Sequence, residues 1–202
     1  MKYVIVGIGT DVGKTVVSAI LTKALGAYYW KPVQSGDLHF SDTDKVQTYV
    51  GDSFRKIQER WRLNTPVSPH YAAEIDEVNI MDTDFVIPNV TPLIIEGAGG
   101  LMVPLNNEGL LYLDLLEKWK LPVVLVSRHY LGSINHTLMS IESLKNRKIE
   151  IAKVVFNGDE NIATEKIIKS LHPDLDYVRI SHLTDLNQES IAHESKKIKG
   201  SF

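Results

Sequence analysis

A glycine-rich segment near the start of the chain has the residues that phosphate binding requires. It reads Gly7-Ile8-Gly9-Thr10-Asp11-Val12-Gly13-Lys14-Thr15, after an apolar run and before a stretch with helical spacing. The strict pattern G-x4-G-K-[ST] is not met, because its first glycine should stand where Ile8 is. The physical conditions are met, since glycines let successive N–H groups surround an anion and the helix N-terminus adds positive charge. Lys14 would bridge the β- and γ-phosphates of a nucleotide, and the Thr15 hydroxyl would coordinate Mg²⁺.

Two ordinary structures compete with this interpretation. One is a plain tight turn between a strand and a helix. The other is the dinucleotide-binding fingerprint G-x-G-x-x-G, which would need a glycine at Val12. Neither explains why Lys14 is followed by Thr15, so phosphate binding is the favoured interpretation.

A lysine stands at the end of the second predicted strand, in Lys31-Pro32-Val33-Gln34-Ser35-Gly36. Ligands of open α/β sheets bind beyond the carboxyl ends of the strands, so Lys31 should face the same crevice as Lys14. At ~4 Å and an effective dielectric of ~20, each ammonium group contributes about 4 kcal/mol toward one negative charge. Two lysines would stabilise a phosphoryl group in transfer, although a surface lysine at a strand end is the simpler alternative.

A carboxylate follows another buried strand, in Glu96-Gly97-Ala98-Gly99-Gly100. A carboxylate at a strand end opposite a phosphate loop is placed to hold Mg²⁺, directly or through water. The glycines after it let a ligand approach the backbone. The alternative is an ordinary turn after a core strand.

Three further segments each allow two interpretations. Asp42-Thr43-Asp44 opens a predicted helix, so its residues are either metal ligands or simple N-caps. Gly132-Ser133-Ile134-Asn135-His136 opens another, where free N–H groups could bind a carboxylate or Ser133 could be the cap. Asn157-Gly158-Asp159 could present an amide to an adenine edge, or be a common turn.

The hydrophobic pattern predicts the elements that would position these segments. Strands are expected at Tyr3–Val6, Tyr28–Trp30, Leu93–Ile95, Pro122–Ser127, Ile151–Phe156 and Tyr177–Ile180. Helices are expected at Val16–Leu25, Asp42–Val50, Leu110–Trp119, Gly132–Lys145, Ile162–Leu171 and near Glu189–Lys197. Residues 52–90 should form long loops around one or two helices, and Gly97–Gly100 a glycine-rich turn. The alternation predicts an α/β fold, a mostly parallel sheet with helices on both faces, in a single domain over residues 1–202.

Composition excludes several classes of protein. The 202 residues carry a formal net charge of −3, which argues against a dedicated nucleic-acid binder. The absence of cysteine excludes disulfides, thiolate zinc sites and a cysteine nucleophile, and it fits a cytoplasmic protein. The apolar runs are too short to span a membrane, and the first seven residues read as a core strand rather than a signal peptide.

Taken together, the motifs resemble those of the dethiobiotin synthetase family, the ATP-dependent ring-closing enzymes of biotin synthesis. The segments that carry the resemblance are Gly7-x5-Gly13-Lys14-Thr15, Lys31-Pro32-Val33-x-Ser35-Gly36, Ser68-Pro69-His70, Glu96-Gly97-Ala98-Gly99-Gly100 and Leu131-Gly132-x-Ile134-Asn135-His136. The phosphate loop that is one residue longer than the strict pattern is the family's own form. The resemblance implies a P-loop NTPase-like sheet, usually in a homodimer, that uses ATP and Mg²⁺.

The resemblance also implies roles for particular residues. Those implied in nucleotide binding are Gly9, Thr10, Asp11, Val12, Gly13, Lys14, Thr15, Glu96, Gly97, Gly99 and Asn157. The implied metal ligands are Thr15, Asp44 and Glu96, and Asp44 fits better than Asp42 because Val46 stands two positions after it. The implied catalytic residues are Lys31, Lys14 and Ser35. The substrate would contact Thr10, Lys31 and Ser35, with its carboxylate received by Gly132, Ser133, Ile134 and Asn135 of the neighbouring subunit.

The implied reaction joins CO2 to 7,8-diaminopelargonate. One amine becomes a carbamate, ATP phosphorylates it to a carbamic–phosphoric anhydride, and the second amine closes the ring. The chain departs from the family in Arg179-Ile180-Ser181-His182-Leu183, which lacks the usual glycine and proline near the adenine, and in Asp11, where some relatives have Glu.

Two other classes share this kind of fold. A nucleotide-switched, partition-type ATPase would carry a signature lysine where this chain has Gly9. An amidoligase acting on a corrinoid would need a glutaminase domain with a nucleophilic cysteine, and the chain has none.

Overall fold

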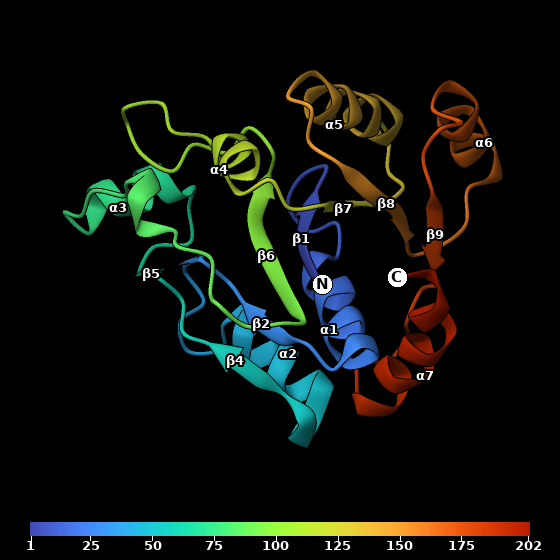
Figure 1. Cartoon of the computed structure of the whole chain (residues 1–202), viewed down its shortest axis with the longest axis horizontal. Coiled ribbons are helices and arrows are strands. Elements are labelled where there is room, and N and C mark those ends of the chain that lie inside the picture. Colours follow the sequence, from blue (N-terminus) through green and yellow to red (C-terminus); the bar gives the residue numbers. More distant parts are fainter.

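The computed structural model describes residues 1–202 and is built on a seven-stranded parallel sheet (Figure 1). Its strands are β1 (Lys2–Gly7), β2 (Tyr28–Trp30), β4 (Arg55–Ile57), β6 (Leu93–Gly100), β7 (Val123–Ser127), β8 (Ile151–Asn157) and β9 (Tyr177–Ile180). They lie in the order β4-β2-β6-β1-β7-β8-β9, so β1 is central. Two short strands, β3 (Val33–Ser35) and β5 (Trp61–Leu63), pair with each other outside this sheet. The predicted α/β fold with a mostly parallel sheet is confirmed.

Helices cover both faces of the sheet. They are α1 (Lys14–Leu25), α2 (Asp42–Val50), α3 (Pro69–Ile75), α4 (Tyr112–Trp119), α5 (Ser133–Asn146), α6 (Ile162–Leu171) and α7 (Gln188–Ile198), with single 3₁₀ turns at Gly51–Ser53, Asp82–Asp84 and Lys199–Ser201. Helices α1, α2 and α7 pack together on one face, and α4, α5 and α6 lie on the other (Figure 1). No helix combines the length and the apolar character that crossing a bilayer would require.

The core explains why the central strands read as continuous apolar runs. Val4, Ile5 and Val6 of β1 are buried on both faces, and so is every residue of β7. One cluster of 44 buried hydrophobic residues joins the sheet to its helices. Because all seven strands are parallel, the segments after β1, β2, β6 and β7 all begin at the carboxyl edge of the sheet.

The structure differs from the predicted elements in two places. The predicted turn at Gly97–Gly100 is wrong, because these glycines continue β6 and Gly100 pairs with Gly7 of β1. The long loops expected over residues 52–90 contain α3 but also β4 and β5, and β3 was not expected. These strands have only three residues each, and two of the three residues in β4 are exposed and charged. They are therefore too short and too polar to show the hydrophobic alternation that predicts a strand.

Candidate active site

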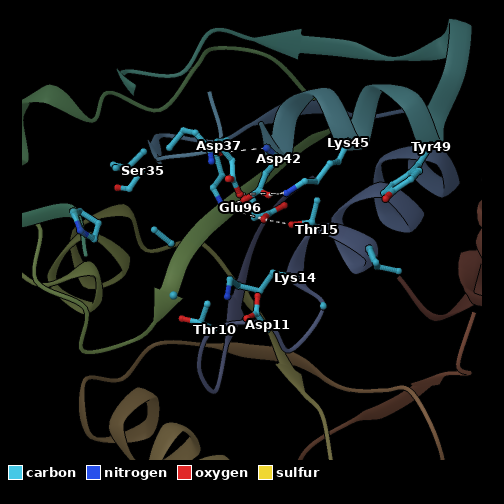
Figure 2. Close-up of a pocket in the computed structure, with 18 of the residues that line it drawn as sticks. Thr10, Asp11, Lys14, Thr15, Ser35, Asp37, Asp42, Lys45, Tyr49 and Glu96 are labelled. Atoms are coloured by element: carbon cyan, nitrogen blue, oxygen red, sulfur yellow. Dashed lines mark hydrogen bonds and ion pairs between the residues drawn. The ribbon is translucent and has the colours of Figure 1, made fainter. Parts of the chain in front are cut away.

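A cavity of about 510 Å³ opens at the carboxyl edge of the sheet (Figure 2). Residues of β6 and of the segments that follow β1, β2 and β7 meet there. Its polar lining includes Thr10, Asp11, Lys14, Thr15, Lys31, Gln34, Ser35, Asp37, Asp42, Lys45, Glu96 and Arg128. The structure therefore brings together the phosphate loop, Lys31, Ser35 and Glu96, which lie far apart in the sequence.

The phosphate loop takes a conformation that needs glycine at one position. Gly13 has φ +94°, and a Cβ there would lie 2.0 Å from Nδ2 of Asn157. The same Nδ2 donates to Val12 O at 3.0 Å, so Asn157 braces the loop. The Lys14 ammonium donates to Gly9 O at 2.8 Å across the loop. Burial and the neighbouring charge of Lys31 lower the pKa of Lys14 to about 8.

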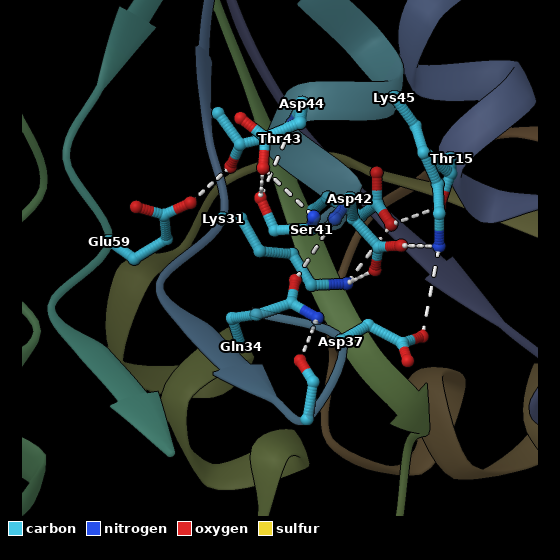
Figure 3. Close-up of polar contacts among 12 residues, drawn as sticks. Thr15, Lys31, Gln34, Asp37, Ser41, Asp42, Thr43, Asp44, Lys45 and Glu59 are labelled. Carbon is cyan, nitrogen blue, oxygen red and sulfur yellow. Dashed lines mark hydrogen bonds and ion pairs between the residues drawn. The ribbon is translucent and has the colours of Figure 1, made fainter. Parts of the chain in front are cut away.

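Lys31 is held in the cavity by carboxylates from two elements (Figure 3). Its Nζ lies 2.7 Å from Oδ2 of Asp42 and 3.0 Å from Oε1 of Glu96, and it also donates to Gly97 O at 3.2 Å. The side chain is only 5% exposed, and burial alone would lower its pKa. The two carboxylates outweigh burial and raise the pKa of Lys31, so its ammonium stays charged.

Glu96 lies at the centre of a hydrogen-bond network. Its Oε1 accepts from Thr15 Oγ1 at 2.8 Å and from Lys31, and its Oε2 accepts from the Tyr29 hydroxyl at 2.9 Å. Tyr29 is fully buried, and burial together with the Glu96 charge raises its pKa. The network joins β6 to the first turn of α1, as Figure 2 shows for Thr15 and Glu96.

The structure separates the two acidic residues at the start of α2. Asp42 lines the cavity and contacts Lys31 and Lys45, whereas Asp44 does not line it. The Asp44 carboxylate accepts from Ser41 N at 2.9 Å and Ser41 Oγ at 2.7 Å in a capping box. Lys31 offsets burial and lowers the pKa of Asp42 to about 2, so this carboxylate is ionised.

The remaining predicted residues divide by position. Thr10, Asp11 and Ser35 line the cavity, and the buried Ser35 hydroxyl has no hydrogen-bond partner. Gly97 and Gly99 lie in β6, and a Cβ at Gly99 would meet Val103 at 2.7 Å. Residues 132–135 line a different hollow at the start of α5.

Four polar cavity residues were not identified from the sequence, namely Asp37, Lys45, Tyr49 and Arg128. Lys45 and Tyr49 lie one and two turns beyond Asp42 on α2, so helical spacing from Asp42 could have found them. Arg128 directly follows β7 and could have been found as a cation at the end of a buried strand.

Known structures share the fold at low sequence identity. A ParA-family ATPase from Chlorobium tepidum aligns over 98% of this chain and 90% of its own, with a TM-score of 0.55 and 14% identity. A plasmid partition protein from Borrelia burgdorferi, solved with AMPPNP, aligns over 100% of this chain and 97% of its own, with a TM-score of 0.59 and 13% identity. These similarities support the P-loop NTPase-like fold.

Curated relatives are much closer in sequence. The ATP-dependent dethiobiotin synthetase of Christiangramia forsetii is 54% identical over 84% of this chain and 82% of its own length. The enzyme of the same name from Brucella anthropi is 47% identical over 94% of this chain and 90% of its own length. A family model described as an AAA domain matches residues 1–191. The resemblance seen in the motifs is thereby confirmed, and the chain belongs to the family of ATP-dependent dethiobiotin synthetases.

Proposed function

We propose that this chain closes 7,8-diaminopelargonate and CO2 to dethiobiotin, with conversion of ATP to ADP and phosphate. The chain is then an ATP-dependent ligase of biotin biosynthesis, as its curated relatives are named. The observation that carries the proposal is the convergence of Lys14, Lys31, Thr15 and Glu96 on one cavity at the sheet edge. Positioning and charge stabilisation are what phosphoryl transfer needs most from a protein.

The oxygen donors in the cavity suit Mg²⁺. Thr15 Oγ1, Glu96 and Asp42 offer a hydroxyl and two carboxylates, the hard ligands that Mg²⁺ prefers, and leave room for phosphate oxygens and water. We assign Asp42 to this set in place of Asp44, whose carboxylate is engaged by its own helix cap. Bound there, the ion would neutralise charge on the transferring phosphate.

Lys31 and Ser35 are the residues best placed for the carbamate. One neutral amine of the substrate attacks CO2, loses a proton and becomes a carbamate. The Lys31 ammonium leaves its carboxylates to bind the carbamate and the γ-phosphate, and the unpaired Ser35 hydroxyl donates to a carbamate oxygen.

Transfer of the γ-phosphoryl group to a carbamate oxygen gives a carbamic–phosphoric anhydride and ADP. The second amine then attacks the carbonyl carbon, the bond to phosphate breaks, and a proton leaves the nitrogen. The products are the cyclic urea and inorganic phosphate. Lys14 holds the β- and γ-phosphates during transfer, for which its ammonium must be charged.

The start of α5 is the proposed site for the substrate carboxylate, in a homodimer. Leu131 is fully exposed and Ile134 is 37% exposed there, an apolar surface suited to a second copy of the chain. Helix N–H groups at Ser133 to Asn135 would bind the carboxylate of a substrate held by the partner.

A turnover assay tests this proposal. The protein is incubated with ATP, Mg²⁺ and bicarbonate, with and without the diamine, and both ADP and dethiobiotin are measured. We expect ADP release that depends on the diamine and matches dethiobiotin mole for mole. ADP release that is the same without the diamine would instead indicate a nucleotide-switched ATPase.

A further inference from the structure

The charges that line the cavity are balanced before any ligand enters. Its cationic side chains are Lys14, Lys31, Lys45 and Arg128, and its carboxylates are Asp11, Asp37, Asp42 and Glu96. Lys31 and Lys45 both lie within ion-pair distance of Asp42, and each has one further carboxylate partner. Two of the four cations are therefore already neutralised by the protein.

The other two cations contact no carboxylate. Lys14 donates to Gly9 O at 2.8 Å, and Arg128 donates from Nη1 to Asp11 O at 3.3 Å. Both acceptors are neutral backbone carbonyls of the phosphate loop, which bind a cation more weakly than a charged phosphate does. These two side chains can therefore bind a polyanion such as MgATP without breaking an ion pair within the protein.

The backbone of Arg128 is firmly placed beside the phosphate loop. Gly7 of β1 pairs with Val126 of β7, and Ile8 N donates to Val126 O at 3.0 Å. The fully buried Ser127 is held to Thr137 by a hydroxyl–hydroxyl hydrogen bond of 2.8 Å. The strand end is thus fixed, while the Arg128 side chain itself is exposed and can move.

We propose that Arg128 is a further cationic ligand of the nucleotide's phosphate chain, in addition to Lys14 and Lys31. When MgATP binds, the guanidinium exchanges Asp11 O for phosphate oxygens, to which its planar set of N–H groups can donate in pairs. This assignment rests on the proposed nucleotide site, and it adds a cation that neither the motifs nor the sequence identified.

Nucleotide titrations test the assignment. MgATP, ADP and adenosine are titrated calorimetrically into the full-length wild type and into Arg128→Met, Arg128→Lys and Arg60→Met. Arg60 is the matched control, because it carries the same charge, is half-exposed and pairs with Asp84 outside the cavity. Melting curves of all four proteins establish that each is folded.

Arg128→Met should weaken MgATP binding about tenfold or more, as expected for a lost hydrogen bond between charged groups. Adenosine binding should not change, Arg128→Lys should lose less, and Arg60→Met should match the wild type. Unchanged MgATP affinity in Arg128→Met, or an equal loss in Arg60→Met, would overturn the assignment. If the wild type itself binds no MgATP, the proposed function fails rather than the role of Arg128.

Discussion

At the scale of single residues, Lys31 is both a structural ion-pair partner and the proposed catalytic cation. Its ammonium lies between two carboxylates, Asp42 and Glu96, and is almost completely buried. The same contacts keep it charged and aim it at the cavity. Its two functions can be separated by experiment, because one concerns folding and the other turnover.

Lys31→Met should lower kcat at least about 10²-fold, since one preorganised charge contact to the transferring group is lost. It should also lower stability by about 3–5 kcal/mol without metal, because two carboxylates lose a buried partner. Added Mg²⁺ should restore part of that stability, because the ion would bind the two carboxylates and offset their charge. Turnover measurements and melting curves with and without EDTA check this, and a variant with wild-type kcat would contradict the role.

Two buried tyrosines near Glu96 offer a matched comparison. The Tyr29 hydroxyl donates to Glu96 Oε2 at 2.9 Å, whereas the equally buried Tyr112 hydroxyl has no hydrogen-bond partner. Tyr29 therefore positions a proposed metal ligand, and Tyr112 does not.

Tyr29→Phe should raise the Mg²⁺ concentration for half-maximal activity about tenfold or more, which corresponds to one lost hydrogen bond to a charged group. The affinity for Mn²⁺, measured by electron paramagnetic resonance with nucleotide present, should fall in parallel. Tyr112→Phe should leave both values unchanged. Equal effects of the two substitutions would show that Tyr29 acts only through packing.

At the scale of elements, the two aspartates in the first turn of α2 make different contacts. Asp42 faces Lys31, while Asp44 completes the N-terminal capping box with Ser41 (Figure 3). The resemblance implied Asp44 rather than Asp42 as a metal ligand, because Val46 stands two positions after Asp44. Which side of a first helical turn faces a cavity depends instead on how the helix packs. That packing, against α1 and α7, is not visible in local sequence.

Substitution of each aspartate by asparagine separates the two tasks. Asp42→Asn should raise the Mg²⁺ requirement and leave the helix cap intact. Asp44→Asn should lower stability by about 0.3–1 kcal/mol, because the first turn of the helix loses a negative charge, with an unchanged Mg²⁺ requirement. Chemical denaturation measures the stability of both variants, and Mg²⁺ titrations of activity measure their metal requirement. A raised Mg²⁺ requirement in Asp44→Asn but not in Asp42→Asn would identify Asp44 as the metal ligand instead.

The sequence predicted best the elements that have clear end signals or a strong hydrophobic pattern, whatever their length. The bounds of β2, α2, α6 and β9 agree with the structure, because each has a strong hydrophobic period or clear end signals. The strand over Gly97–Gly100 was missed because glycine disfavours strands locally. A Cβ on Gly100 would lie 3.6 Å from the Gly9 Cα, an ordinary contact, so packing against the phosphate loop does not by itself require glycine there.

At the scale of the whole molecule, the exposed apolar surface around α5 has no partner within one chain. Besides Leu131 and Ile134, Met102 is 60% exposed and Met139 is 59% exposed. His136, Met102 and Met139 line one hollow, and Leu131 and Ile134 line its neighbour. This surface adjoins the helix start proposed to receive the substrate carboxylate.

Leu131→Glu should therefore dissociate the proposed dimer and raise the KM for the diamine at least tenfold, because burying a charge at such an interface is costly. Nucleotide affinity should stay unchanged, since the cavity belongs to one chain. Sedimentation velocity and steady-state kinetics check this. A wild type that is monomeric and active at assay concentrations would exclude the shared site.

The central claim is that two ammonium groups and a divalent ion meet at the γ-phosphate. A crystal structure with a non-hydrolysable ATP analogue, Mg²⁺, the diamine and bicarbonate tests it most directly. The account predicts Lys31 Nζ within hydrogen-bond distance of both the γ-phosphate and the carbamate, with the ion on Thr15, Glu96 and Asp42. A Lys31 that stays on Asp42 and Glu96, with the phosphates and the ion elsewhere, would contradict it.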